Sequence, residues 1–157
     1  MQVRRKDRAL SEEESLVILK DCEYGFMATV SEDGSPYVIP LSYVFTDGAI
    51  YFHCAINGHK LSNLKHSPKV CFSVAESTMP VYDGGFSTYY RSAVVFGTAL
   101  MVTDQKERHK ALADLCEKYL PDYMNKVEEN ITKSDKITLV YKITPERISG
   151  KSKKRPA

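Results

Sequence analysis

Hydrophobic and polar residues follow two different periods in the first third of the chain, and the change of period marks the first elements. Ser11 and Glu14 have the spacing of a capping box, and the apolar residues behind them predict a short helix that ends near Cys22. Strand-like alternation follows, and the Asp47-Gly48 pair is a strong signal for a tight hairpin turn. The alternation predicts three strands in an antiparallel meander, at residues 25–30, 37–45 and 49–54.

The rest of the chain combines helices with three more strands. Pro68 ends a short helix predicted over 58–66, and Asp104 caps a longer helix with one apolar face. Gly97 lies inside a long β-rich run, where it predicts a bulge or bend. The remaining elements predicted are strands at 69–75, 87–102 and 137–143, a loop at 76–86, and helices at 104–119 and 121–130. Together these predict a mainly β, α+β fold, a six-stranded antiparallel barrel with peripheral helices.

Composition adds limits to this picture. The 157 residues suit one domain with one core, and 43% hydrophobic with 27% charged residues is ordinary for a soluble globular protein. No apolar run approaches the roughly 20 residues needed to cross a bilayer, and the charged start of the chain does not resemble a secretory signal. The four cysteines form no CxxC pair, so no zinc or thioredoxin-like site is indicated, and free thiols indicate a reducing, cytoplasmic location.

Charge is unevenly placed. The net charge of +2 is too small to indicate a nucleic-acid partner. Basic residues nevertheless gather at both ends of the chain, within positions 4–8 and 147–155. Such runs are usually solvated, and a flexible basic tail is predicted at about 150–157. The alternative is a weak polyanion-binding patch, but no aromatic residues interleave with the charges as in specific single-strand binding.

One short segment has the chemistry of an anion site. Gly58, His59 and Lys60 open the predicted helix at 58–66. The start of a helix offers free backbone N–H groups and the positive end of the helix dipole, while lysine adds a full charge. On these grounds alone the tripeptide is a weak signal, and it fits either a phosphate site or an ordinary solvated loop.

Four segments, in order along most of the chain, carry a resemblance to a known family. They read RRKDRALSEEE, DGSPYVIPLSYVFTDGAIYFHCAINGHKLSNL, FSTYYRSAVVFGTA and ITPERISGK. In these segments the chain resembles the pyridoxamine 5′-phosphate oxidase-related flavoproteins, and within them the nitroimidazole-resistance (Nim-type) branch. The resemblance implies a split β-barrel homodimer with FMN at the subunit interface.

The resemblance also implies a set of site residues. The strand from Val38 to Tyr43 would run along the flavin, with Ile39 and Leu41 contacting the ring through their backbone groups. Tyr43 or Ser42 would approach the flavin or its tail, and His59 with Lys60 would bind the phosphate. The full set of implied cofactor-binding residues is Val38, Ile39, Pro40, Leu41, Ser42, Tyr43, Phe52, His53, Cys54, His59 and Lys60, with Tyr89, Tyr90, Arg91 and Ser92 supplied by the partner subunit.

The resemblance implies an FMN-dependent oxidoreductase that reduces the nitro group of a nitroaromatic, 5-nitroimidazole-type acceptor to an amine. His53 is the implied catalytic residue and would hydrogen-bond or protonate the substrate, while Arg91 or His53 would face N1 and O2 of the flavin. One alternative is a flavin- or haem-binding protein without efficient catalysis, with His53 or His59 on the iron. Another is a flavin reductase or a pyridoxamine 5′-phosphate oxidase. Against the oxidase, His59-Lys60 replaces its Arg-Lys pair, and its C-terminal substrate-binding segment has no match here.

Overall fold

The helix caps predicted from the sequence are present in the structure. The structure is a computed structural model and describes residues 3–82 and 84–154. The Ser11 hydroxyl accepts the Glu14 N–H at 3.1 Å and the Glu14 carboxylate accepts the Ser11 N–H at 2.9 Å, so the capping box opens α1 (Glu12–Asp21). The Asp104 carboxylate accepts the Glu107 N–H at 2.8 Å and caps α3 (Gln105–Tyr119). The other elements are β1 (Ala9–Leu10), β2 (Tyr24–Val30), β3 (Pro36–Ser42), β4 (Val44–Thr46), β5 (Ala49–Ala55), β6 (Lys69–Tyr82), β7 (Phe86–Met101), β8 (Thr138–Lys153), α2 (His59–His66), α4 (Val127–Ser134) and the 3₁₀ helices η1 (Lys6–Arg8), η2 (Pro121–Lys126) and η3 (Asp135–Ile137).

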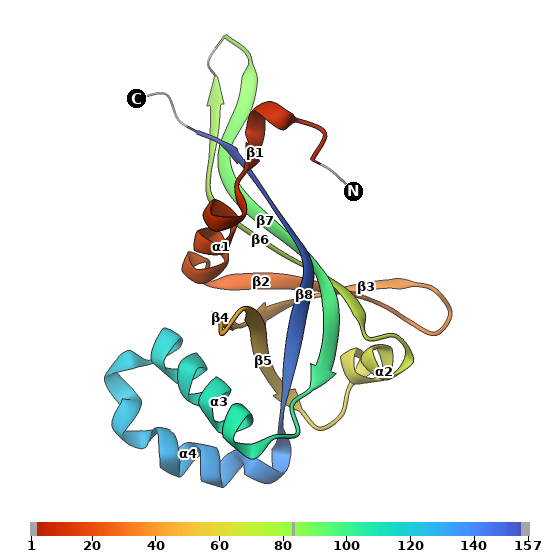
Figure 1. Cartoon of the computed structure of the whole chain (residues 1–157), viewed down its shortest axis with the longest axis vertical. Helices are drawn as coiled ribbons and strands as arrows, with labels where there is room; N and C mark the ends of the chain where they lie inside the picture. Colours follow the sequence, from red (N-terminus) through yellow and green to blue (C-terminus); the bar gives the residue numbers. More distant parts are fainter. Residues whose placement is uncertain (1–2, 83, 155–157) are drawn as a thin grey trace.

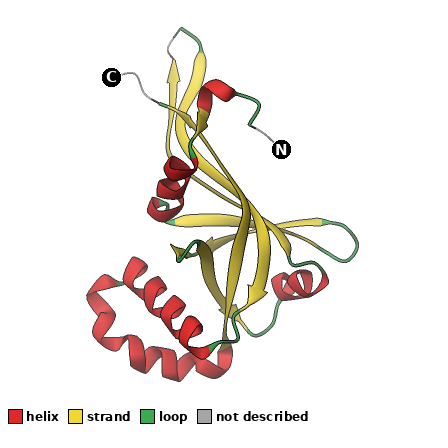
Figure 2. Cartoon of the chain, viewed as in Figure 1, coloured by secondary structure: helices red, strands yellow, loops and turns green. Residues whose placement is uncertain are grey.

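The strands form one antiparallel sheet, with helices at its periphery (Figure 1, Figure 2). Its order is β3-β2-β6-β7-β8-β5-β4, and β1 pairs with β8. The sheet is not closed, since β3 and β4 are its two edges and Tyr43 joins them along the chain. This confirms a mainly β, α+β split-barrel fold.

Two details of the predicted topology are wrong. The meander is only partly correct. The end of its middle strand, β4, forms the predicted hairpin with β5, but β5 pairs along its length with β8, from Ile50 opposite Ile143 to Ala55 opposite Thr138, and not with β3. The strand predicted over 37–45 is two strands that break at Tyr43, because the chain there leaves one edge of the sheet and starts the other. With β4 and the short β1, the described residues hold eight strands, where the sequence predicts six.

The long strands also extend beyond their predicted ends. The loop predicted at 76–86 is mostly a hairpin between β6 and β7, with a bulge between Glu76 and Met79. The tail predicted at 150–157 belongs to β8 as far as Lys153, which lies opposite Tyr90 in the ladder, while residues 155–157 lie outside the described part. Pairing satisfies the backbone of these polar segments, so their composition does not decide their structure. The bulge predicted at Gly97 is confirmed by the register shift between β7 and β8.

Two hydrophobic clusters lie on opposite faces of β5. The first includes Ile50, Phe52 and Phe72, all fully buried inside the barrel. The second lies between the sheet and helices α3 and α4 and includes Tyr51. Successive strand residues point to opposite faces, so β5 is the wall between the barrel interior and the helical layer.

The helices of the structure are short. Within residues 3–82 and 84–154, no helix combines the length and the apolar character that crossing a bilayer requires.

Candidate functional site

The start of α2 has the geometry of an anion site. Gly58 precedes the helix with φ of 132°, a backbone conformation that favours glycine, and its carbonyl accepts the Leu61 N–H at 3.0 Å. The first N–H groups of the helix therefore point outward at the positive end of the helix dipole. The predicted short helix is confirmed.

Lys60 lies beside this helix start and is half-buried. Its Nζ is 5.3 Å from the centroid of the Phe52 ring, a cation–π contact. Burial lowers the pKa of Lys60 below its ordinary value. Among the residues that the structure describes, no carboxylate lies within ion-pair distance of this ammonium group, so its charge is available for an external anion.

His59 points to a different surface from Lys60. Its Nε2 lies 3.0 Å from the Ser31 hydroxyl, and its ring meets Tyr37 edge-on, with centroids 4.7 Å apart. These contacts hold the imidazole against the turn between β2 and β3. The role of His59 and Lys60 as a phosphate pair stays a prediction, in which Lys60 is the charged member.

The end of β5 places its predicted residues on two faces. Phe52 is fully buried and stacks on Tyr141 with ring centroids 5.7 Å apart, and Cys54 packs against the same interior cluster. His53 points to the opposite face, toward α3 and α4. Burial and, to a smaller degree, the charge of Lys60 lower the pKa of His53 below its ordinary value, so the neutral ring prevails at neutral pH.

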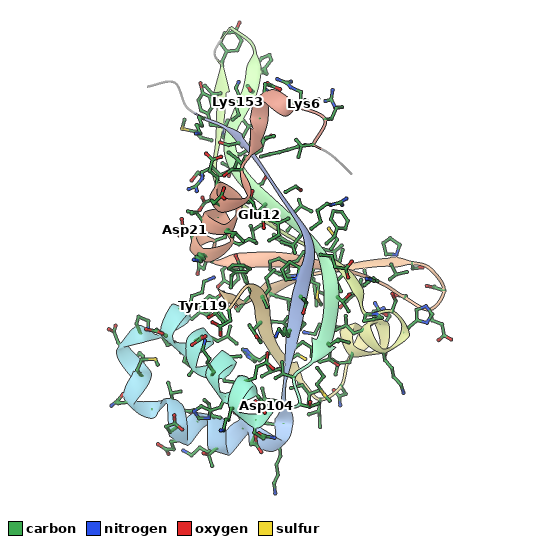
Figure 3. The ribbon with its side chains drawn as sticks, viewed as in Figure 1. Lys6, Glu12, Asp21, Asp104, Tyr119 and Lys153 are labelled. Carbon is green, nitrogen blue, oxygen red and sulfur yellow. The ribbon has the colours of Figure 1, made fainter. Side chains whose placement is uncertain are left out.

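His53 opens on a pocket of about 590 Å³ between the sheet and the helical layer. Ser42, at the end of β3, lies on the same rim. The helical walls are largely apolar, and the Tyr119 hydroxyl at one side accepts the Tyr43 N–H at 2.9 Å. Figure 3 shows Tyr119 at the end of α3. The residues lining the pocket are Glu23, Tyr24, Ser42, His53, Leu112, Leu115, Cys116, Tyr119, Leu120, Asn130, Ile131, Ser134 and Thr138.

Along β3 the predicted residues alternate between core and surface. Val38 and Pro40 are exposed, Ile39 and Ser42 half-buried, and Leu41 and Tyr43 buried. The Tyr43 hydroxyl donates to the Leu19 carbonyl at 2.7 Å, so its side chain is held in the core, and burial raises its pKa. Of the two candidates at the end of this strand, Ser42 is the one whose side chain borders a pocket.

The predicted partner segment lies elsewhere in the same chain. Tyr89, Tyr90 and Arg91 line a pocket of about 640 Å³ along the β6–β7 hairpin, whereas Ser92 lines a different one. Arg91 pairs with Glu76 across the hairpin at 2.7 Å. In Figure 1 the hairpin reaches the top of the molecule and α2 lies at the lower right. A single chain therefore does not bring this segment to Lys60, and its role stays a prediction that requires a second chain.

The helical half of the His53 pocket is absent from the sequence-based site. Leu112, Leu115 and Ile131 line it, but in the sequence they are only the apolar face of helices. An unusual signal was the polar His53 within the apolar run of β5, followed about 50 residues later by an amphipathic helix. Nothing local in the sequence identifies this helix as the one that lines the pocket beside the histidine.

Comparisons with known proteins agree with this architecture. The model of the pyridoxamine 5′-phosphate oxidase family matches residues 11–152. A search of curated proteins gives no match. Among solved structures, a candidate 5-nitroimidazole antibiotic resistance protein from Bacteroides thetaiotaomicron is 21% identical, with a TM-score of 0.75, over 91% of this chain and 85% of that one.

Two further structures share the fold at similar distance. The flavocytochrome Anf3 from Azotobacter vinelandii has a TM-score of 0.84 at 19% identity, over 99% of this chain and 73% of its own. A FAD and haem binding protein from Mycobacterium smegmatis has a TM-score of 0.77 at 23% identity, over 94% of this chain and 74% of its own. At such identities the likeness is one of fold, while the family match spans nearly the whole sequence. The chain belongs to the pyridoxamine 5′-phosphate oxidase family.

Proposed function

We propose that this protein is an FMN-dependent oxidoreductase that reduces small nitroaromatic acceptors of the 5-nitroimidazole type. One observation carries the proposal: the end of β5 separates an anion site at Lys60 from an apolar pocket that contains His53. A flavin mononucleotide has an anionic phosphate and a reactive ring, so it needs both kinds of surroundings. The solved structures of a resistance protein and of flavin-binding proteins with this fold support the choice of chemistry.

The residues at α2 fit a flavin phosphate. Lys60 has no carboxylate partner among the described residues, and the N–H groups at the helix start point outward beside it. Ser42 lies on the rim of the His53 pocket, where a flavin ring and its ribityl chain need hydrogen-bond partners. Flavin, when bound, supplies the electron-transfer chemistry, and the protein positions it.

The chain's own residues then have distinct tasks. The apolar walls of Leu112, Leu115 and Ile131 exclude water and favour a flat, weakly polar acceptor. His53 is a polar residue in the lining of the pocket. Its neutral ring can donate a hydrogen bond to a nitro oxygen, and its protonated form can deliver a proton there. An external reduced donor supplies the electrons.

A second candidate function is haem binding without efficient turnover. The observation in its favour is the neutral His53 imidazole at the wall of a large apolar pocket, because a neutral imidazole is an iron ligand. The flavocytochrome and the FAD and haem binding protein share this fold. The absorption spectrum of the purified protein separates the two: flavin gives near-ultraviolet and blue bands, and haem gives a Soret band.

The phosphate assignment is tested at Lys60. We expect Lys60→Ala to weaken FMN binding about 10- to 100-fold, because it removes a charge-assisted hydrogen bond. Fluorescence titration of the flavin-free protein measures this. Lys65→Ala is the matched control, since Lys65 is exposed on the last turn of the same helix, and its effect should stay below about twofold. Equal losses in both variants would reject the assignment.

We further propose that two copies of the chain form a homodimer that completes the site. Strands β2 and β3 carry an outer apolar face of Phe26, Ala28, Val38 and Pro40, in which Phe26 lies opposite Pro40 and Ala28 opposite Val38. Phe26 is 51% exposed and Val38 57% exposed. Two large apolar side chains on one sheet face favour burial against another molecule. A second copy would also supply the Tyr89–Ser92 segment.

Dimerisation and flavin binding are then expected to fail together. Phe26→Asp places a charge in the outer apolar face, so we expect a monomer in light scattering and a loss of bound flavin on purification. Tyr123→Asp is the control, because Tyr123 is similarly exposed on η2 in the helical layer. A Phe26→Asp protein that is monomeric and yet retains flavin would show that one chain is sufficient.

A further inference from the structure

A separate pocket of about 310 Å³ lies on the outer side of β7 and β8. Its floor consists of three pairs of directly opposed residues: Ser92 with Lys151, Val94 with Ser149, and Phe96 with Arg147. Each strand contributes every second residue, so all six side chains share one face.

The two ends of the chain meet at this pocket. Val3 and Arg4 line it together with the strand residues. The N-terminal segment is held there because β1 pairs with β8, with Ala9 opposite Lys151. Figure 3 labels Lys6 and Lys153 in the upper part of the view, at the two ends of the chain. The fold thus brings Arg4 to the same pocket as Arg147 and Lys151, which lie more than a hundred positions away in the sequence.

The lining has the chemistry of an oxyanion site. It contains the cations Arg4, Arg147 and Lys151 and the hydroxyls of Ser92 and Ser149, and no carboxylate is part of it. All of these groups donate hydrogen bonds to phosphate or carboxylate oxygens.

Arg147 is the best-positioned of the three cations. Its guanidinium carbon lies 4.4 Å from the centroid of the Phe96 ring, so the group is stacked in place. Its Nε is buried and has no hydrogen-bond partner among the described residues. A buried, unsatisfied donor costs free energy unless an acceptor is supplied, and an oxyanion in the pocket is such an acceptor.

We propose that this pocket binds the phosphate group, or a similar oxyanion, of a small molecule other than the flavin. The pocket is too small for a polyanion and holds one anionic group with little else. It lies on the same side of the sheet as the outer apolar face, because Phe26 lies opposite Ser73 and Ser73 opposite Val94. The flavin phosphate is placed at Lys60, so Ser92 is the one described pocket residue that also belongs to the proposed flavin site, and the cations of the pocket are separate from it.

Inorganic phosphate is the probe for this site. We compare thermal unfolding in sodium phosphate and in sodium chloride at equal ionic strength. At about tenfold excess over its Kd, phosphate should raise the Tm of the wild-type protein by about 3–5 °C more than chloride does. Arg147→Gln and Lys151→Gln should each lose this increment. Lys136→Gln, which removes an exposed charge on η3 at the far end of β8, should keep it.

Three results would overturn the proposal. In the first, phosphate raises the Tm of the wild-type protein no more than chloride does. In the second, phosphate raises the Tm of Arg147→Gln and Lys151→Gln by the same amount as that of the wild type. Protection could also vanish once the protein is saturated with FMN, which would assign the pocket to the flavin phosphate. Protection that persists with FMN bound supports a separate anion. If the protein binds no flavin, the phosphate increment is still measured, so the two proposals fail independently.

Discussion

Replacing His53 with glutamine is expected to lower the rate of nitro-group reduction by about 100- to 10,000-fold while flavin stays bound. Glutamine keeps a hydrogen-bonding side chain at the pocket wall but cannot deliver a proton. The measurement is turnover of a 5-nitroimidazole by flavin-saturated protein with a reduced donor, beside the flavin content of each variant. His66→Gln is the control, since His66 is exposed on α2. Unchanged turnover in His53→Gln would exclude the residue from catalysis.

The pH dependence gives a second measure of the same group. Burial and the charge of Lys60 lower the pKa of His53 below 6.5, so the ring gains its proton only as the pH falls below that value. If the protonated ring is the donor, the rate should rise as the pH falls, and this ionisation should be absent from His53→Gln. The stability of the fold depends on pH in the opposite direction from the rate. The neutral ring stabilises the folded state above pH 6.5, and this contribution is lost as the pH falls through the lowered pKa.

Replacing Phe72 with alanine is expected to destabilise the fold by about 3–5 kcal/mol. Phe72 is fully buried in the barrel interior and meets the Tyr43 ring edge-on, with centroids 4.8 Å apart. The chain leaves room for this ring at Gly25, where an added Cβ would lie 1.9 Å from its tip. Truncation therefore leaves a cavity that the rigid strands around it cannot fill.

Urea unfolding of the flavin-free protein measures this loss without a contribution from ligand binding. Phe86→Ala is the matched control, because the same atoms are removed from a side chain that is 98% exposed, and its effect should be about 0.5 kcal/mol or less. Similar midpoints for the two variants would mean that the interior collapses around the smaller side chain.

Elements with local signals could be predicted from the sequence, and pairings between distant segments could not. Three local signals lie where predicted: the capping box of Ser11 and Glu14, the hairpin turn at Asp47-Gly48, and the helix start at Gly58. Each depends only on residues a few positions away. The pairing of β5 with β8 joins segments about 90 residues apart, and no local preference selects it. The polar end of β8 is a strand because β7 on one side and β1 on the other supply its hydrogen-bond partners.

The same division applies to the site. The anion-binding start of α2 is contained in one tripeptide and is visible in the sequence. The His53 pocket needs α3 and α4, and the outer pocket needs Arg4 beside Arg147, so both exist only after folding. Arg91 is assigned to the flavin site from the sequence, but in the single chain it pairs with Glu76 instead.

The break in the sheet at Tyr43 has a consequence for how this barrel accommodates its contents. Within the described strands, no ladder joins β3 to β4 or β5, so the width of this opening is not set by backbone pairing. It is set by Tyr43, whose hydroxyl donates to Leu19 of α1 and whose N–H donates to Tyr119 of α3. Substitutions in these helices can therefore change the aperture beside Ser42 and His53 while every strand keeps its register. Such a barrel can be adapted to larger or smaller ligands by substitutions in the helices that pack against its sheet.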